Sequence, residues 1–465
     1  MEDFIIMSRP NTIKTVLSTA SCKLTRALLR RTGRGGTAVP GKVAMKVAPD
    51  ILKAVSQGME IVVVTGTNGK TTTCNMTWHA IKECGHDCLL NRSGANLLSG
   101  ITADLTCNAD WKGRPRTHYA VLECDEAALK QVVPLVRPRA VVVTNLFSDQ
   151  VDRYGGVQNT LAEIRKGVKL VPETTLVLNA DEPLSASLAL GVPNKTIFYG
   201  MNSSVGVRGD VDLNDAGVCP VCGKAYEWDF HIYAHLGGYR CPGCGYGRKA
   251  PDVEVRSIEK LSALGSRIRL WTAEGERDVD ISLPAVYNIY NAAAALGAAM
   301  ALGLPLDTAA ASLSSVESSF GRLETFDLKG NRLQMILVKN PAGCNQAFSY
   351  LTSLNEEFTA VLCLNDRTGD GHDISWINDT DYEKLCADPH LKKIYVCGDR
   401  KEDLDARLAK AGAPAKIRQI VGDYDTLLGL LLEEDRPIFA LPNYTAMMEL
   451  RKVLSTATGK KDFWA

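Results

Sequence analysis

The chain has 465 residues, a length that predicts two or three domains, and 45% of them are hydrophobic, enough for cores of ordinary size. Its 53 Lys and Arg residues balance 53 Asp and Glu residues, so overall charge favours no particular class of partner. No apolar run approaches the roughly 18 residues of a membrane span, and the N-terminus lacks a secretory signal pattern. Ten of the 14 cysteines are scattered singly, which favours a reducing compartment and hence a cytoplasmic protein.

Residues 1–44 form a basic N-terminal segment. Apolar residues within residues 13–29 recur mostly at helical spacing, and cations far outnumber acids. Such a helix could lie on an anionic surface at the inner face of the cell membrane. It could equally pack on the next domain with its charges in water. The glycine-rich residues 31–36 then indicate a flexible linker.

A glycine-bearing loop follows the β-branched run Val62-Val-Val64 and precedes a segment with helical character. Glycines let backbone N–H groups approach phosphate oxygens, a lysine adds positive charge, a threonine hydroxyl can bind Mg²⁺, and the helix N-terminus favours an anion. The usual motif has a glycine where this chain has Val64, so the loop is a shorter Gly-x-x-Gly-Lys-Thr form. We predict that it binds nucleotide phosphates through Gly66, Thr67, Asn68, Gly69, Lys70, Thr71 and Thr72.

Four short apolar runs predict further parallel strands buried on both faces, at residues 119–123, 140–144, 175–179 and 196–199. Polar residues at the carboxyl ends of such strands lie where ligands bind in open α/β sheets. Glu123 ends one run and is therefore a candidate Mg²⁺ ligand beside Thr71, although a helix cap or a surface acid would look the same. Asn145 directly follows the next run.

Two Cys-x-x-Cys pairs follow in the chain, Cys219 with Cys222 and Cys241 with Cys244. Each pair lies in a turn with Pro or Gly, and the spacing is typical of a structural Zn²⁺ site with four thiolate ligands. Redox pairs are the alternative, but neither pair opens a helix. We expect a zinc ribbon at residues 215–250. The hairpin between the pairs holds few cations, which argues against nucleic acid as a partner.

Residues 253–283 alternate in polarity around a turn near residues 263–265, which predicts a β-hairpin. A strongly helical segment begins at about Tyr287, and Asn288 and Asn291 share one face of its first turn. One of these amides could cap the helix. Two at this spacing could also bind a nucleotide base or phosphate.

A boundary near residue 316 precedes a second α/β pattern that runs to residue 465. Its predicted strands lie at residues 333–338, 360–364, 393–396 and 437–440. Two strand-end loops are candidate site segments, namely residues 339–343 and residues 365–376, the second of which contains Asp370 and Asp373. A solvated acidic loop is the alternative interpretation.

Together these motifs resemble the Mur ligase family of ATP-dependent acid–amine ligases, from about residue 45 to the C-terminus. The segments that carry the resemblance are Gly66-Thr-Asn-Gly-Lys-Thr-Thr72, Glu123, Thr144-Asn145, Asn179-Ala-Asp181-Glu-Pro183, Asn288 with Asn291, and Gly321-Arg322-Leu-Glu324. The four-cysteine insertion, Val-Lys-Asn-Pro-Ala-Gly and Asp-Gly-x-Asp-x-Ser-Trp are similar to the MurT-type group within this family.

The chain departs from the usual family pattern at three places. Gln150 stands where most members have a metal-binding histidine, and Ile336 replaces the aspartate of Asp-x-x-His-Asn-Pro. A second Mg²⁺ is therefore less firmly expected. Only about fifty residues precede the ATPase core, too few for a UDP-binding domain. A lipid-linked substrate is expected instead of a UDP-linked one.

The resemblance implies a fold and a domain order. We expect an α/β protein: a Mur ligase-type P-loop ATPase domain at residues 45–315, with a parallel sheet and the inserted zinc ribbon. A smaller Rossmann-like α/β domain would follow at residues 316–465.

The resemblance also implies a reaction. ATP would phosphorylate the α-carboxyl of D-glutamate in the lipid II stem peptide, and ammonia from a GatD-type glutaminase subunit would convert the acyl phosphate to D-isoglutamine. Lys70 and Mg²⁺ at Thr71 and Glu123 would stabilise the transferring phosphoryl group.

By family motif, Asn288, Asn291 and Arg322 would bind the nucleotide. Asp373, with Asp370 as the second choice, would complete the partner's Cys-His pair. Two alternatives remain: a Mur-type ligase that adds an amino acid to a peptide or folate-like carboxylate, and a non-enzymatic P-loop regulator with a zinc ribbon.

Overall fold

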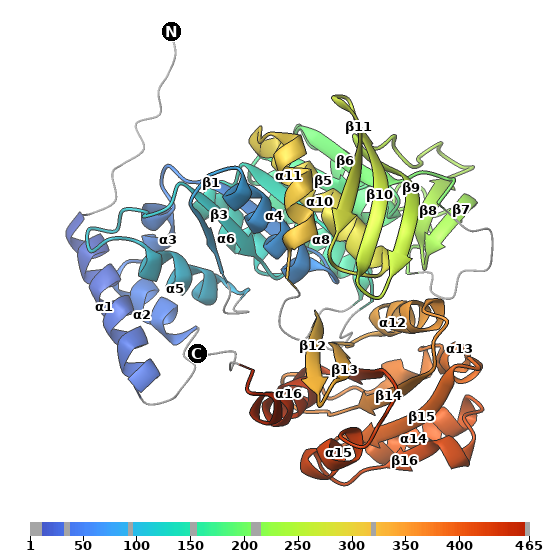
Figure 1. Ribbon diagram of the computed structural model, residues 1–465. Coiled ribbons are helices and arrows are strands. Elements are labelled where there is room, and N and C mark those ends of the chain that lie inside the picture. Colours follow the sequence, from blue (N-terminus) through green and yellow to red (C-terminus); the bar gives the residue numbers. More distant parts are fainter. Residues whose placement is uncertain are drawn as a thin grey trace.

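The computed structural model describes residues 12–31, 38–91, 96–148, 156–205, 215–317 and 322–460. Figure 1 shows two α/β bodies, with the first described helices at the outer edge of the larger one. In the described part of the chain, no helix combines the length and the hydropathy that a bilayer span requires.

The first helix, α1 (Thr12–Arg31), confirms the helix predicted over residues 13–29 and packs on α2 (Val39–Val47) and α5 (Leu98–Asn108). It buries small or polar side chains, among them Ser18, whose hydroxyl donates to the Ala44 carbonyl at 2.8 Å. The helix therefore packs through the side opposite to the one its hydrophobic pattern favours. Its large apolar side chains remain exposed, namely Ile13, Leu17, Leu24 and Leu28.

The larger body is built on a nine-stranded sheet in the order β11-β10-β9-β6-β5-β4-β1-β3-β2. Seven strands are parallel: β2 (Cys88–Leu90), β3 (Tyr119–Glu123), β1 (Glu60–Thr65), β4 (Ala140–Val143), β5 (Thr175–Asn179), β6 (Thr196–Met201) and β9 (Val253–Ser262). Two antiparallel strands complete one edge, β10 (Gly265–Thr272) and β11 (Gly275–Ile281). The predicted hairpin over residues 253–283 is thus too simple, because a second turn after Thr272 returns the chain as a third strand.

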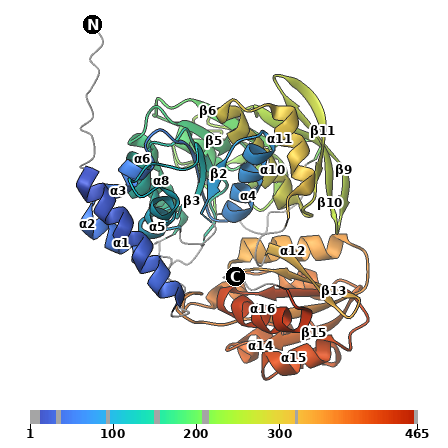
Figure 2. The same ribbon diagram turned by 60° about the vertical axis from the view of Figure 1, so that its left-hand side comes forward.

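Helices cover both faces of this sheet, because its central strands are apolar on both sides. One face packs against α4 (Lys70–Glu83), α10 (Val286–Leu302) and α11 (Leu306–Ser312). The other packs against α3 (Ile51–Val55), α5, α6 (Leu129–Val136) and α8 (Val157–Lys169). Figure 2 shows α4, α10 and α11 together on their side of the sheet.

The four-cysteine insertion forms a separate two-stranded sheet of β7 (Glu227–Tyr233) and β8 (Leu236–Arg240). The fully buried Asp181, before α9 (Pro183–Ala186), attaches it to the larger body. The Asp181 carboxylate accepts hydrogen bonds from Arg248 Nε at 2.6 Å, the Tyr290 hydroxyl at 2.7 Å and the Met201 backbone N–H at 2.7 Å. Its carbonyl accepts from the backbone N–H of Gly237 at 2.8 Å.

The smaller body is a six-stranded sheet in the order β12-β13-β17-β14-β15-β16. Its strands are β12 (Arg322–Leu328), β13 (Asn331–Ile336), β14 (Phe358–Cys363), β15 (Leu391–Cys397), β16 (Arg418–Ile420) and β17 (Ile438–Pro442), all parallel except β12. Five helices accompany it: α12 (Pro341–Ser353), α13 (Tyr382–Cys386), α14 (Lys401–Lys410), α15 (Tyr424–Leu431) and α16 (Tyr444–Thr458). The α/β class is as predicted; the domain boundaries at residues 44 and 315 stay predictions.

Candidate functional site

The loop between β1 and α4 approaches its neighbours more closely than any side chain would allow. Gly66 has φ +118°, and a Cβ there would lie 2.3 Å from Thr144 Oγ1. Gly69 has φ +86°, and its Cβ would lie 2.2 Å from Asn291 Oδ1. Both positions therefore require glycine for conformation and for space. The loop can bring its backbone N–H groups and the N-terminus of α4 toward an anion.

Lys70, the first residue of α4, is buried within this loop. Its ammonium donates to the Gly66 carbonyl at 2.5 Å and to the Thr67 carbonyl at 3.3 Å, and forms an ion pair with Glu126 at 2.8 Å. Glu126 is itself buried, and its role was not predicted from the sequence. The available signal was the run of acids that follows β3, Glu123-Cys-Asp-Glu126.

Thr71 and Glu123 meet as the sequence predicts, because the Thr71 hydroxyl donates to Glu123 Oε2 at 2.7 Å. Glu123 is buried at the end of β3, so it is neither a surface acid nor a helix cap. Asn91 holds its backbone on both sides, accepting from the Glu123 N–H at 2.8 Å and donating to the Glu123 carbonyl at 3.0 Å. A carboxylate and a hydroxyl side by side suit Mg²⁺, which prefers oxygen ligands.

Asn145 fastens the loop that follows β4 to the loop that follows β1. Its amide accepts from the Asn68 N–H at 2.9 Å and donates to the Asn68 carbonyl at 3.2 Å. The Thr67 hydroxyl accepts from the Phe147 N–H at 3.0 Å. Thr72 points from the first turn of α4 into the cleft between these elements.

Asn288 and Asn291 lie on α10 with their amides hydrogen bonded to each other, Asn291 Nδ2 donating to Asn288 Oδ1 at 3.0 Å. Asn288 also donates to the Pro284 carbonyl at 2.6 Å, and Asn291 Oδ1 accepts from the Thr73 hydroxyl at 3.3 Å. Neither amide caps α10, whose N-cap is Ala285 and lacks a side-chain bond. Both line the same cleft as Gly69 and Thr72.

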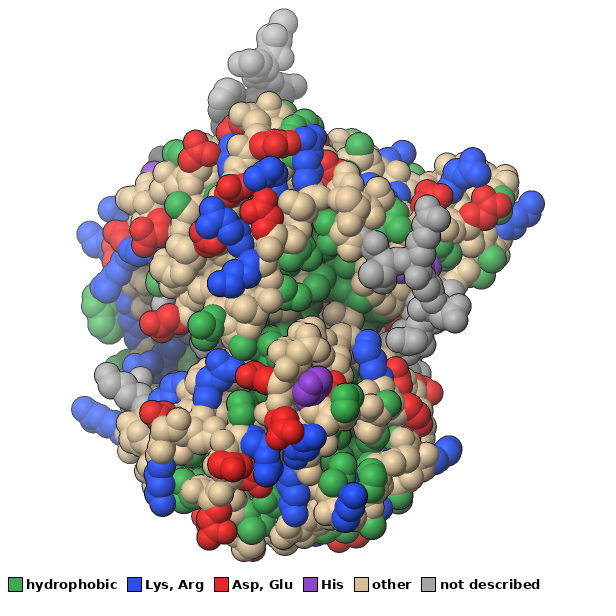
Figure 3. All heavy atoms as spheres, turned by 45° about the vertical axis from the view of Figure 1, so that its right-hand side comes forward, with side chains coloured by type: hydrophobic (Ala, Val, Ile, Leu, Met, Phe, Trp, Pro, Cys, Tyr) green, Lys and Arg blue, Asp and Glu red, His purple; other side chains and the backbone are tan. Residues whose placement is uncertain are grey.

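The cleft has an empty volume of about 740 Å³, part of it open to solvent, and the surface is hollowed between the two bodies (Figure 3). The phosphate loop and the two asparagines of α10 form the polar part of its lining. Other lining side chains are apolar or aromatic, among them Phe147, Leu283 and Tyr287. The smaller body closes the cleft through the ends of β12 and β13 and the start of α12. Asn340, the N-cap of α12, donates to Asn68 Oδ1 at 3.3 Å.

Tyr233, the last residue of β7, also lines this cleft and was not predicted as a site residue. Its ring is nearly parallel to that of Phe147, with centroids 6.4 Å apart, and meets Tyr290 edge-on at 5.8 Å. Next to it, the buried His235 places Nε2 3.1 Å from the Leu146 carbonyl. The insertion thus contributes the Tyr233 side chain to the lining of the cleft.

Three predicted positions cannot be placed in the site. Gln150 and Gly321 lie outside the described residues, and so does the side chain of Arg322. Only the backbone of Arg322 is described, as the first residue of β12 beside the cleft residue Leu323.

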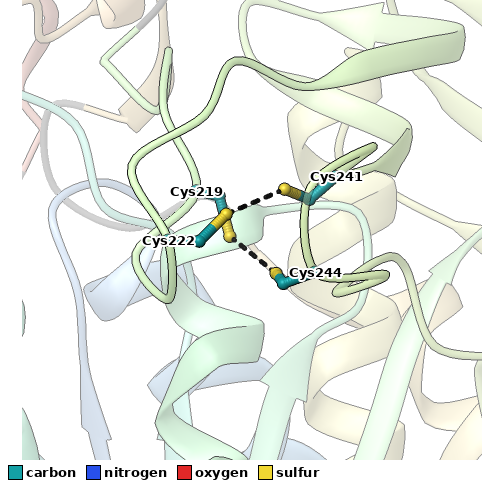
Figure 4. Close-up of side chains that lie close together, drawn as sticks. All are labelled: Cys219, Cys222, Cys241 and Cys244. Carbon is teal, nitrogen blue, oxygen red and sulfur yellow. Dashed lines mark hydrogen bonds between the residues drawn. The ribbon is translucent and has the colours of Figure 1, made fainter.

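The four cysteine sulfurs lie together, each within 4.8 Å of the others (Figure 4). Cys219 Sγ is 3.6 Å from Cys244 Sγ, and Cys222 Sγ is 3.3 Å from Cys241 Sγ. A tetrahedral Zn²⁺ with Zn–S bonds of about 2.3 Å would place its sulfurs about 3.8 Å apart, so this set of ligands fits zinc. All four positions would be protein thiolates, which leaves no open place for catalysis.

The two aspartates of the C-terminal loop differ in their surroundings. Asp370 accepts from the Thr445 N–H at 2.8 Å and from the Thr445 hydroxyl, so its carboxylate is committed to the first turn of α16. Asp373 is exposed and accepts from the Ser375 N–H at 2.8 Å. That backbone N–H lowers the pKa of the Asp373 carboxyl below its usual value, so this side chain is charged at neutral pH.

Comparisons with known proteins identify the family. Residues 64–299 match the Mur ligase middle domain, and residues 337–447 match the MurT ligase C-terminal domain. The chain is 34% identical over 447 residues to the MurT subunit of lipid II isoglutaminyl synthase (glutamine-hydrolyzing) from Streptococcus pneumoniae, covering 96% of this chain and 98% of the relative. The chain belongs to the MurT family of Mur ligases.

Solved Mur ligase structures share the fold. MurF from Acinetobacter baumannii aligns with a TM-score of 0.67 at 17% identity, covering 90% of this chain and 80% of MurF. MurF from Thermotoga maritima, in complex with ADP, aligns with a TM-score of 0.62 at 14% identity, covering 91% and 85%. Both support the α/β Mur ligase fold.

In this Mur ligase loop, Gly69→Ala should lower the free energy of unfolding by about 2 kcal/mol, because an alanine there has both an unfavourable φ and a clash with Asn291. Urea denaturation measures the change. The matched control is Gly429→Ala in α15, where a Cβ meets nothing within 4 Å. The control should gain about 0.5 kcal/mol, since alanine is the better helix former. Equal stabilities for the two variants would contradict the close approach.

Proposed function

We propose that the chain is the ligase subunit that amidates lipid II, converting the α-carboxyl of D-glutamate in the stem peptide to D-isoglutamine. The observation that carries this proposal is its 34% identity, over nearly the full length of both chains, to a subunit named for that activity. The cleft supports the energy source, because a phosphate-binding loop lies beside a pair of Mg²⁺-type ligands.

In the proposed reaction, ATP phosphorylates the carboxylate, which by itself is a poor electrophile. Ammonia then attacks the acyl phosphate, an amide bond forms, and phosphate leaves as a proton is lost. Lys70 is placed to hold a phosphate oxygen, and Thr71 with Glu123 would bind Mg²⁺, which neutralises charge on the transferring group. We assign Asn145, Asn288, Asn291 and Arg322 to nucleotide binding.

We further propose that the four cysteines bind a structural Zn²⁺, which would hold the ribbon and therefore Tyr233 in place. The two Cys-x-x-Cys pairs of the ribbon lie in turns that are separated by 18 residues, and a shared ion would join these turns. Native mass spectrometry that finds the reduced chain without zinc would contradict this assignment.

The reaction itself is tested by incubating the chain, its partner and lipid II with ATP, and by measuring ADP release and the mass of the lipid product. We expect a product one mass unit lighter, as an amide replaces the acid, with ammonium or glutamine but not with glutamate as the source of nitrogen. Lys70→Ala should reduce turnover at least a hundredfold, because phosphoryl charge would lose its positive partner. Turnover with glutamate would favour a Mur-type ligase that adds an amino acid, and ATP turnover without an acceptor would favour a P-loop regulator.

We place the purine base against Tyr233, whose ring lines the cleft beside Phe147. Tyr233→Ala should weaken ATP binding about tenfold, since stacking on a base contributes about 1–3 kcal/mol. Isothermal titration measures the affinity, and Tyr233→Phe should retain it because the ring is kept. Inorganic tripolyphosphate should bind all three forms equally. Equal weakening of ATP and tripolyphosphate would show that the change disturbs the loop instead of the base site.

We propose that the ammonia comes from a GatD-type glutaminase partner, as the relative's name as a glutamine-hydrolyzing synthase subunit supports. Asp373 is our choice for the aspartate that completes the partner's Cys-His pair. It is exposed and charged, whereas the Asp370 carboxylate is occupied by Thr445.

Asp373→Asn should therefore abolish amidation with glutamine while leaving amidation with ammonium unchanged. A lost carboxylate would no longer orient the partner's histidine, but the ligase cleft would be intact. The measurement is the ratio of the two rates in the reconstituted complex. The matched control is Asp379→Asn, an exposed aspartate six residues further on, for which the ratio should stay at the wild-type value. Equal loss with both nitrogen sources would rule out the assignment.

A further inference from the structure

The exposed side of α1 is apolar, and nothing in the described structure covers it. Ile13, Leu17, Leu24 and Leu28 are 73%, 56%, 65% and 65% exposed. At about 100° per residue, these four side chains lie within an arc of about 60°, on the side of the helix opposite to its buried residues. The buried side carries Thr15, Ser18, Thr19 and Cys22.

This arrangement is the reverse of an ordinary surface helix, which turns its apolar stripe toward the core. α1 does not need the stripe for packing, because its small residues already make the contact with α2 and α5. Ser18 bonds to Ala44, and Gly113 lies so close that a Cβ there would meet Thr15 at 2.4 Å. Among the described residues the stripe is therefore left exposed, and contiguous exposed apolar surface marks interaction sites.

Cations border this stripe. α1 and α2 together contain seven Lys and Arg residues and no Asp or Glu, although the whole chain has equal numbers of each. Elsewhere, on the face in Figure 3, positive and negative side chains are interspersed. At about 100° per residue, Lys14 lies about 40° beyond one edge of the stripe, and Arg31 lies within its arc at the end of the helix. Lys23 and Arg30 lie about 80–100° beyond the other edge.

The loop after α5 also exposes an apolar ring together with basic side chains. Trp111 is 57% exposed, and the Lys23 ammonium lies 4.9 Å from the centre of its ring. Exposed Lys112, Arg114 and Arg116 follow in the same loop. A tryptophan with neighbouring cations is typical of a surface that enters the region between lipid headgroups and acyl chains.

We propose that this docking face (Ile13, Leu17, Leu24, Leu28 and Trp111) binds the surface of an anionic lipid bilayer. The apolar stripe enters the headgroup boundary while the exposed Lys14, Arg30 and Arg31 contact lipid phosphates. The Lys23 ammonium donates to the Ala109 carbonyl and stays with the protein. The inference deepens the proposed function, because a lipid-linked substrate is presented at such a surface. The proposed membrane binding does not depend on the substrate, since the contacts are with bulk lipid.

The test is sedimentation of the full-length chain with vesicles that contain no lipid II, so amidation plays no part. Phosphatidylcholine vesicles with phosphatidylglycerol should bind the chain, and pure phosphatidylcholine vesicles should bind it at least tenfold more weakly. Leu17→Ser combined with Leu24→Ser should reduce binding to anionic vesicles about tenfold. Both side chains are exposed, so the fold should not change, and circular dichroism and urea denaturation check this.

The matched control replaces two exposed apolar residues far from α1, Leu264→Ser and Ile420→Ser, and should bind within twofold of the wild type. Equal vesicle binding by the two double variants would overturn the proposal. So would sedimentation velocity showing that the α1 variant only separates a dimer, because the face would then be an interface between two copies. Loss of vesicle binding with intact amidation of detergent-solubilised lipid II would support the docking face and the proposed function separately.

Discussion

The buried carboxylate of Asp181 joins three parts of the larger body. It binds Arg248 in the ribbon, Tyr290 on α10 and the backbone of β6. Burial raises the pKa of this carboxyl above its usual value, while the guanidinium of Arg248 acts in the opposite direction. A buried acid without such partners would be strongly unfavourable, so the three elements are held in one arrangement. The same arrangement holds Tyr233 of the ribbon beside α10, the helix that carries Asn288 and Asn291.

Around this junction, the site is assembled from strand ends that are distant in sequence. The phosphate loop follows β1, Glu123 ends β3 and Asn145 follows β4, and these three strands are adjacent in the sheet. Parallel strands bring their carboxyl ends to one edge, which explains why residues some 80 positions apart share hydrogen bonds. The smaller body adds its own strand ends from the other side, through Asn340.

Much of this could be predicted from the sequence, because the local patterns are strong. The β-branched runs indicate the parallel strands, and the Gly-x-x-Gly-Lys-Thr spacing indicates the loop. Glu126 and Tyr233 could not be predicted, because their importance depends on tertiary contacts with Lys70 and Phe147. The sequence pattern also did not predict how α1 packs. Hydrophobic periodicity identifies an apolar stripe, but it does not reveal which side of a helix contacts the rest of the protein.

The position of Lys70 has a consequence for affinity. An ammonium has three N–H donors, and Gly66, Thr67 and Glu126 each accept from it. A flexible lysine loses considerable rotamer freedom when it is immobilised, but here folding has already ordered the side chain. An incoming phosphate oxygen thus replaces an existing acceptor. The net gain in binding free energy is the difference between two strong contacts. The lysine is thus ordered before a phosphate arrives, and part of the entropic cost of binding is met when the chain folds.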